Sequence, residues 1–190
     1  VSWNALIMGY ADHGHGMEAL KCFEDMEHEG FCPNNTTFVG ILKACGSIVA
    51  INKGHEIHAQ IDQNGLLEKD VVVGNALIDM YAICGELYKA QEVLEELLVR
   101  DVVTWTAIIT GLVKQGHAKE ALYYFDEMII EGKMKPDRVT FISMIDGCAS
   151  LANLELGQII HAQVIEAGIV GDIFIETSLL NMYGKSGCLY

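Results

Sequence analysis

The chain carries the stretch Trp3-Asn-Ala-Leu-Ile-Met-Gly-Tyr10 four times in related forms. The other copies are Gly74-Asn-Ala-Leu-Ile-Asp-Met-Tyr81, Trp105-Thr-Ala-Ile-Ile-Thr-Gly-Leu112 and Glu176-Thr-Ser-Leu-Leu-Asn-Met-Tyr183. Each copy reaches a glycine four residues later, at Gly14, Gly85, Gly116 and Gly187. A second pattern, Phe38-Val-Gly-Ile-Leu-Lys-Ala-Cys45, recurs as Phe141-Ile-Ser-Met-Ile-Asp-Gly-Cys148. Such self-similarity is typical of a repeat architecture.

The sequence also repeats at a longer period, which spans several of the short repeats. Matching residues stand 102 or 103 positions apart, as Trp3 and Trp105, Pro33 and Pro136, Cys45 and Cys148, His58 and His161, Asp70 and Asp172, and Tyr81 and Tyr183. Three unequal units therefore repeat as a triplet. We predict a single repeat array over residues 1–190, with units near 1–34, 35–70, 71–101, 102–137 and 138–172 and an incomplete unit over 173–190.

Within each unit the apolar period is that of a helix. In the first unit, one apolar face comprises Leu6, Ile7, Tyr10 and Ala11, and a second face after Gly14 comprises Ala19, Leu20, Phe23 and Met26. This pattern predicts a helix A, a short turn and a helix B that ends near Gly30. One such hairpin cannot cover its own apolar faces, so neighbouring hairpins stack. The predicted fold is an all-α solenoid of antiparallel helix-turn-helix repeats with no sheet.

Composition agrees with a helical array and excludes other classes. Apolar residues make up 51% of the chain and only two prolines interrupt it. The six cysteines show no CxxC pairing, and we interpret them as reduced core residues. No apolar run reaches the roughly 18 residues of a membrane span. The formal net charge of −14 opposes simple electrostatic binding of nucleic acid.

The units resemble pentatricopeptide repeats, through segments such as "VSWNALIMGYADHGHGMEALKCFEDMEHEG", "FVGILKACGS", "GHEIHAQI" and "VVTWTAIITGLVKQGHAKEALYYFDEMIIEG". The alternation of standard, long and short units resembles the plant PLS subclass. The resemblance implies a right-handed superhelix that binds single-stranded RNA in a chloroplast or mitochondrion, most often to specify a cytidine for editing to uridine. It implies editing-complex proteins as further partners, and no catalysis, cofactor, membrane or small-molecule substrate.

The family assigns one base to a repeat through a residue early in helix A and the last residue of the same repeat. By resemblance, the base-specifying pairs are Asn4 with Asn34, Asn75 with Asp101, and Thr106 with Asp137, and Thr177 begins a further pair. With the array's N-terminus toward the RNA 5′ end, these pairs favour a pyrimidine, then U, then G. The long units place Val39 with Asp70 and Ile142 with Asp172, and an aliphatic side chain cannot read a hydrogen-bonding edge.

The resemblance also assigns residues that sandwich each base. These base-flanking residues are Val1, Thr36, Val72, Val103, Val139 and Phe174. We expect Asn4, Asn75, Thr106 and Thr177 to lie on the concave side, and packing of these side chains inside the stack would argue against RNA reading. The structural alternative is that these four residues cap helices, because Asn and Thr are favoured there.

Other sites and functions have weaker support. His55 and His58 lie one helical turn apart, but "HEIHA" is not HExxH, and we predict no metal site. The HxE and CxxC signature of a zinc deaminase, a GxSxG turn and a Gly-rich phosphate loop do not occur. A protein-binding scaffold like tetratricopeptide arrays is the rival function and tolerates the acidity more easily.

The segments of the predicted A helices balance their charges. They hold Lys43, Lys114, Arg138 and Lys185 against Asp12, Asp79, Asp146 and Glu176. The whole negative excess therefore falls on the B helices and turns, where we expect an outer, solvated face.

Overall fold

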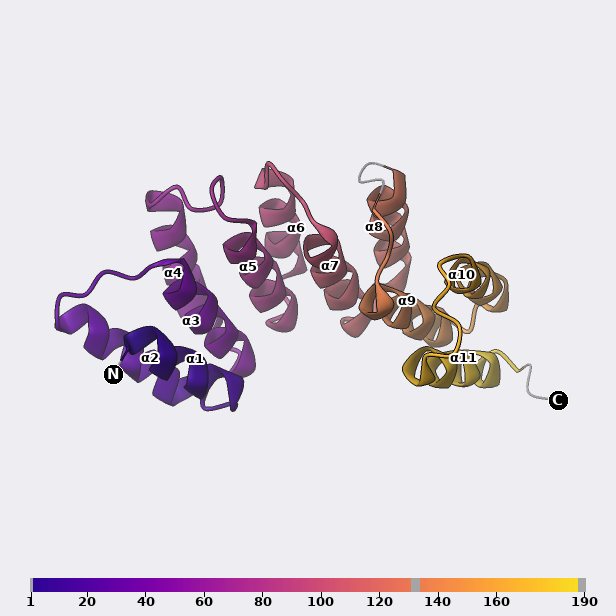
Figure 1. The fold of residues 1–190 in the computed structure, drawn as a ribbon, viewed down its shortest axis with the longest axis horizontal. Coiled ribbons are helices and arrows are strands. Elements are labelled where there is room, and N and C mark those ends of the chain that lie inside the picture. The colour runs from indigo at the N-terminus through magenta and orange to yellow at the C-terminus, as the bar shows by residue number, and fades with distance from the viewer. Residues whose placement is uncertain (1, 131–133, 188–190) are drawn as a thin grey trace. The chain divides into compact units, whose positions relative to one another are not determined.

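The computed structural model describes residues 2–130 and 134–187, which form eleven α-helices and no strand (Figure 1). This confirms the all-α prediction. The chain forms two compact units, residues 1–100 and residues 101–190. No helix in the described ranges is long and apolar enough to cross a bilayer.

The first compact unit contains three helical hairpins. Its helices are α1 (Trp3–Asp12), α2 (Gly16–His28), α3 (Asn35–Ser47), α4 (Ile51–Gln63), α5 (Val71–Ile83) and α6 (Leu87–Glu96). The A helices α1, α3 and α5 pack side by side, and α2 and α4 each pack between two successive A helices. The A helices therefore form one layer, and the B helices cover it from one side.

The second compact unit follows the same scheme. Its helices are α7 (Val102–Lys114), α8 (Ala118–Ile130), α9 (Arg138–Leu151), α10 (Leu154–Glu166) and α11 (Ile173–Lys185). The A helices α7, α9 and α11 pack in a row, with α8 and α10 as the B helices between them. After the first hairpin, each A helix begins at the first residue of a unit that the sequence pattern predicts.

The core repeats from hairpin to hairpin. Phe23 on α2 and its counterpart Phe125 on α8 are 0% and 1% exposed. Phe125 packs against Phe141 of the next A helix, with ring centroids 6.1 Å apart and an edge-on geometry. Since B helices bury these rings against the following repeat, each hairpin depends on its neighbour for a covered core.

A conserved geometry joins helix A to helix B in five hairpins. An amide in the turn donates to the carbonyl five residues before it, as in His15 N to Tyr10 O at 2.9 Å and Ala50 N to Cys45 O at 2.8 Å. This Schellman geometry places one residue in the left-handed region. Gly14 takes that place with φ 76°, whereas in the long units Val49 and Ala152 take it with φ 54° and 48°.

Replacing Val49 with glycine should stabilise the protein. Left-handed backbone costs an L-residue about 1–2 kcal/mol, and the added freedom of glycine in the unfolded chain offsets about half of this. We expect a net gain of about 0.5–1 kcal/mol, seen as a higher midpoint of thermal unfolding. Gly14→Val is the reciprocal control, because a Cβ at Gly14 would meet nothing within 4 Å. A lower midpoint for Val49→Gly would contradict this account.

Candidate RNA interface

The residue that closes each predicted repeat is the N-cap of the next A helix. Asn34, Asp70, Asp101, Asp137 and Asp172 each accept a hydrogen bond from a backbone N–H of the helix that follows. The other members of the predicted pairs lie inside their helices. The alternative that Asn4, Asn75, Thr106 and Thr177 cap helices is therefore wrong, because capping falls to the residues that precede each helix.

The first predicted pair is in direct contact. The Asn4 Nδ2 donates to Asn34 Oδ1 at 3.1 Å, although 30 residues separate them. The Thr37 hydroxyl, on the first turn of α3, donates to Asn4 Oδ1 at 2.6 Å. The Thr37 amide also donates to Asn34 Oδ1 at 3.1 Å. These bonds fix the orientation of the Asn4 amide and place both pair members at the junction of α1 and α3.

The pair of Thr106 and Asp137 is joined through one residue. The hydroxyls of Thr106 and Thr140 are 2.7 Å apart. The Thr140 hydroxyl and amide both donate to Asp137 Oδ1, each at 2.8 Å. Thr140 therefore bridges the two predicted base-specifying residues across the junction of α7 and α9.

Two further base-specifying residues make hydrogen bonds in the second compact unit. Asp101 Oδ1 accepts from the Thr104 amide and hydroxyl at 2.8 and 2.9 Å. Thr177 donates to the Ile173 carbonyl of its own helix at 2.6 Å.

Exposure of the four helix A residues is uneven. Thr177 is exposed and Asn4 is half-buried, but Asn75 and Thr106 are only 8% and 9% exposed. Asn75 and Thr106 therefore lie mostly inside the packed helices, which is the arrangement that argues against base reading by these two side chains. For Thr106 the reason is the following A helix, whose Thr140 covers it. Its partner Asp137 remains exposed, so a part of this pair lies on the surface.

The predicted base-flanking residues form a row along the A helices of each compact unit. Each described member is the second residue of an A helix and is exposed, namely Thr36, Val72 at 55%, Val103 at 58%, Val139 at 47% and Phe174 at 61%. Val1 lies outside the described residues. Apart from Thr36, these residues offer apolar surface beside the N-caps, which is the arrangement that packing against base faces requires.

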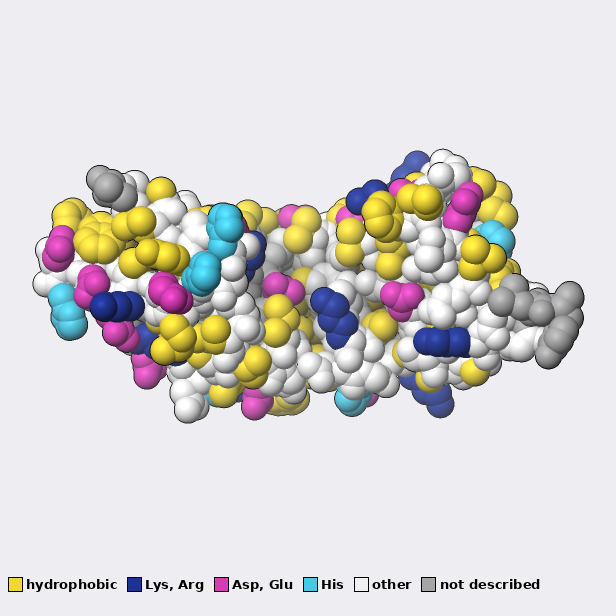
Figure 2. Space-filling model, turned by 90° about the horizontal axis from the view of Figure 1, so that it is seen from below, with side chains coloured by type: hydrophobic (Ala, Val, Ile, Leu, Met, Phe, Trp, Pro, Cys, Tyr) yellow, Lys and Arg dark blue, Asp and Glu magenta, His cyan; other side chains and the backbone are white. Residues whose placement is uncertain are grey.

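Charges on the A helices pair with one another. Lys43 Nζ lies 2.6 Å from Asp12 Oδ1, between α3 and α1. Arg138 lies 3.4 Å from an Asp172 carboxylate oxygen, and its guanidinium stands 5.3 Å from the Phe174 ring centroid. Burial raises the pKa of Asp146, and the Lys185 charge partly opposes this. Figure 2 shows basic, acidic and hydrophobic side chains interspersed on one face, without a continuous basic stripe.

In the long units, the closing aspartate bonds with the first residue of its own unit. The Asn35 Nδ2 donates to Asp70 Oδ2, and Arg138 donates to Asp172 Oδ2 at 3.4 Å. Their helix A positions hold the half-buried aliphatics Val39 and Ile142. The reading position of helix A thus offers no polar side chain to join the aspartate in these two units.

His58 contacts a tyrosine hydroxyl, and the equivalent histidine of the second triplet, His161, makes the same contact. His58 Nδ1 lies 2.8 Å from the Tyr81 hydroxyl, and His161 Nδ1 lies 2.8 Å from the Tyr183 hydroxyl. Burial lowers the pKa of His58 and raises that of Tyr81 to about 12. His58 and His161 therefore share one packing contact with the tyrosine of the following A helix. Across the described ranges, no three His, Cys, Asp or Glu side chains are grouped to hold a metal ion.

The prediction that the cysteines are core residues holds only for some of them. Cys45 and Cys148 are buried, and burial raises the pKa of each thiol to about 11. Cys32, however, is exposed in the connection between α2 and α3. The core interpretation is wrong for Cys32, because its segment leaves helix B before the next hairpin begins.

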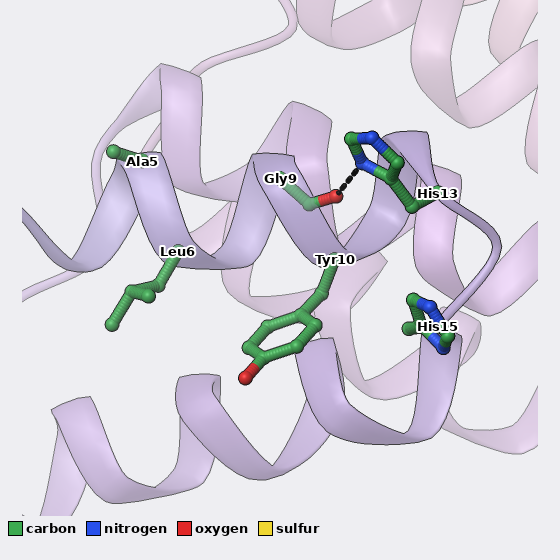
Figure 3. Close-up of a pocket in the computed structure, with 6 residues that line it drawn as sticks. All are labelled: Ala5, Leu6, Gly9, Tyr10, His13 and His15. Atoms are coloured by element: carbon green, nitrogen blue, oxygen red, sulfur yellow. Dashed lines mark hydrogen bonds between the residues drawn. The ribbon is translucent and has the colours of Figure 1, made fainter.

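A hollow of about 320 Å³ lies beside α1 and is lined by Ala5, Leu6, Gly9, Tyr10, His13 and His15. Leu6 and Tyr10 project from one side of α1 (Figure 3). Their counterparts on α3 and α5 (Ile41, Cys45, Leu77 and Tyr81) are at most 1% exposed. The repeated positions are therefore buried on α3 and α5 and open to the hollow on α1.

Sequence reasoning missed the third residue of the A helices. Thr37, Thr104 and Thr140 are at most 1% exposed. Each bonds to the N-cap three residues before it, Thr104 and Thr140 by donating their hydroxyls and Thr37 by accepting from the Asn34 amide. The signal was present as Asn-x-x-Thr and Asp-x-x-Thr at the start of a helix, which is a variant of the capping box.

Comparison with known proteins identifies the family. The PPR repeat family model matches residues 1–47 and 100–150, and the PPR repeat model matches residues 75–102. A chloroplastic pentatricopeptide repeat-containing protein of Arabidopsis thaliana is 40% identical over 187 residues, 98% of this chain and 30% of its own length. A second chloroplastic relative from the same plant is 36% identical over 185 residues, 97% of this chain and 19% of its own length.

Solved structures give the same result. The crystal structure of pentatricopeptide repeat protein PPR10 in complex with an 18-nt psaJ RNA element matches 96% of this chain and 28% of that chain. Its TM-score is 0.82 at 25% identity. PPR10 from maize matches with a TM-score of 0.75 at 24% identity, covering 98% of this chain and 27% of that chain. The chain is a helical-repeat protein, and it belongs to the pentatricopeptide repeat family. It spans less than a third of the length of these relatives.

Proposed function

We propose that this chain is part of a sequence-specific reader of single-stranded RNA, and that its hairpins form one repeat array over residues 1–190. The observation that carries the proposal is the Asn4–Asn34 contact at 3.1 Å, which joins residues from opposite ends of one repeat. Paired polar side chains beside an exposed apolar row offer a base both an edge to bond and a face to stack on.

The base-specifying pairs of the proposal are Asn4 with Asn34, Asn75 with Asp101, and Thr106 with Asp137, with Thr177 opening a further pair. The reading residues of the long units are aliphatic, and their aspartates bond to Asn35 and Arg138, so these units serve as spacers. Alternating unit lengths support membership of the PLS subclass. PPR10 was crystallised with RNA, which supports RNA as the ligand of this chain.

Location and biological process follow from the same relatives. Two relatives carry the label chloroplastic, which supports action in an organelle, either chloroplast or mitochondrion. We assign the array to transcript processing, with specification of a cytidine for C-to-U editing as its most specific form. Editing-complex proteins would then supply the chemistry.

The rival function is a protein-binding scaffold, which the net charge of −14 favours. Mobility shift of single-stranded RNA by the full-length protein, compared with a pull-down on the immobilised protein, separates the two. Retention of proteins with no RNA shift would support the scaffold.

Replacing Val139 with aspartate should weaken RNA binding by about fivefold or more, because it removes an apolar stacking surface and adds a charge that repels phosphate. Ile165→Asp is the matched control, since Ile165 is 55% exposed but lies on the B helix α10. Affinity is measured by fluorescence anisotropy with the full-length protein. Equal effects of the two substitutions would place the RNA away from the A-helix row.

A further inference from the structure

After the first repeat, the third residue of each A helix is buried, and its type correlates with that of the reading residue of the preceding repeat. The reading residue is the predicted base-specifying residue on helix A. Where the reading residue is polar, at Asn4, Asn75 and Thr106, the third residue of the next A helix is threonine (Thr37, Thr104 and Thr140). Where it is aliphatic, at Val39 and Ile142, the third residue is Val73 or Ile175. All five of these third-position residues are at most 1% exposed. Burial alone therefore does not call for a hydroxyl at this position.

The hydroxyl of Thr140 has a defined direction. A threonine hydroxyl has one proton to donate, whereas a carboxylate only accepts. The Thr140 hydroxyl donates to Asp137 Oδ1 at 2.8 Å, so the 2.7 Å contact with Thr106 is one in which Thr106 donates. The single proton of Thr106 is thereby used within the protein. Its oxygen can only accept from a base.

At the junction of α1 and α3, the hydrogen bond between the threonine and the reading residue runs in the opposite direction. The Asn34 backbone N–H donates to Thr37 Oγ1 at 3.1 Å, and Thr37 donates to Asn4 Oδ1 at 2.6 Å. The Asn4 amide is then fixed at both ends, because its Nδ2 donates to Asn34 Oδ1. One amide hydrogen and one carbonyl lone pair of Asn4 remain for a ligand.

Thr177 provides an internal comparison. It occupies the same helix position as Thr106, but its hydroxyl donates to the Ile173 carbonyl at 2.6 Å. A threonine at this position can thus donate to its own helix, whereas Thr106 donates to the Thr140 hydroxyl of the next A helix.

We propose that Thr37 and Thr140 are specificity-positioning residues, which orient the reading side chain of the preceding repeat and fix the donors and acceptors that it presents to a base. This inference rests on the proposed RNA-reading function. At the unit 102–137, an acceptor-only Thr106 selects a base with a donor on the contacted edge. Guanine has a donor at N1, where adenine has an acceptor, so Thr140 enforces discrimination between G and A.

Binding of the full-length protein to two RNAs that differ only as G or A opposite the unit 102–137 tests this. Thr140→Val keeps the shape and removes the hydroxyl, and it should lower the preference for G over A by about tenfold. Thr140→Ser should keep the preference near that of the unaltered protein. Thr110→Val is the matched control, because Thr110 bonds to Ser143 across the same two helices at 2.7 Å.

The outcomes separate this inference from the proposed function. A preference for G that persists in Thr140→Val would overturn the positioning role and leave RNA reading intact. An unaltered protein with no preference between G and A would overturn both. If Thr140→Val does not fold, Thr37→Val gives a second test. It should reduce the preference for pyrimidine opposite the unit 1–34 and leave the G position unchanged, and an unchanged pyrimidine preference would overturn the inference.

Discussion

Phe125→Ala should destabilise the second compact unit by about 3–5 kcal/mol, the usual cost of removing a fully buried aromatic ring. Phe125 is 1% exposed and packs edge-on against Phe141 of the next A helix. Loss of the ring leaves a cavity between α8 and α9 at the junction that holds two repeats together. Because repeat stability is a sum of local and nearest-neighbour contributions, protection from hydrogen exchange should fall most in α8 and α9.

Tyr123→Ala is the control for this prediction. Tyr123 lies two residues away on α8 and is 60% exposed, so its removal should change stability by no more than about 0.5 kcal/mol. Comparable losses of protection in the two variants would mean that α8 contributes through its helix propensity and not through the buried ring.

Much of the fold could be predicted because the apolar residues within each helix recur with the helical period. The glycine after each standard or short A helix marks the left-handed turn residue, and the first residue of each predicted unit after the first begins an A helix. In the long units the same turn forms around Val49 and Ala152, where no glycine marks it. The Schellman hydrogen bonds and helix stacking there override the backbone preference of valine.

The candidate site was less accessible to sequence reasoning because it forms between repeats. Asn34 and Asp137 end one unit in the pattern, yet in space they begin the next helix as its N-cap. The burial of Thr106 depends on Thr140, which lies 34 residues ahead. Periodicity within one helix carries no information about such a neighbour. The spacing of residues across the junction does carry it, through the threonine three positions after each cap.

Thr106→Asn should move the base preference at one nucleotide from G to U by about 1–3 kcal/mol, the typical value of a well-made base contact. Asp137 stays in place, so the unit 102–137 acquires the Asn and Asp combination that the unit 71–101 already contains. The Thr140 hydroxyl would hold the new side chain as it holds Thr106. Its proton goes to Asp137 Oδ1 at 2.8 Å, so its oxygen accepts one hydrogen of the introduced amide. An amide so fixed can both donate and accept, as the edge of uracil requires.

Competition binding of the full-length protein with four RNAs that differ only at the predicted G measures the shift. Ile142→Asn is the control in a long unit, where Asp172 already bonds to Arg138 and the next third residue is Ile175, so the added amide finds no hydroxyl to orient it. Its effect on base preference should be smaller than that of Thr106→Asn. Equal loss of affinity for all four bases in Thr106→Asn would show that Thr106 supports the packing of α7 against α9 and reads nothing.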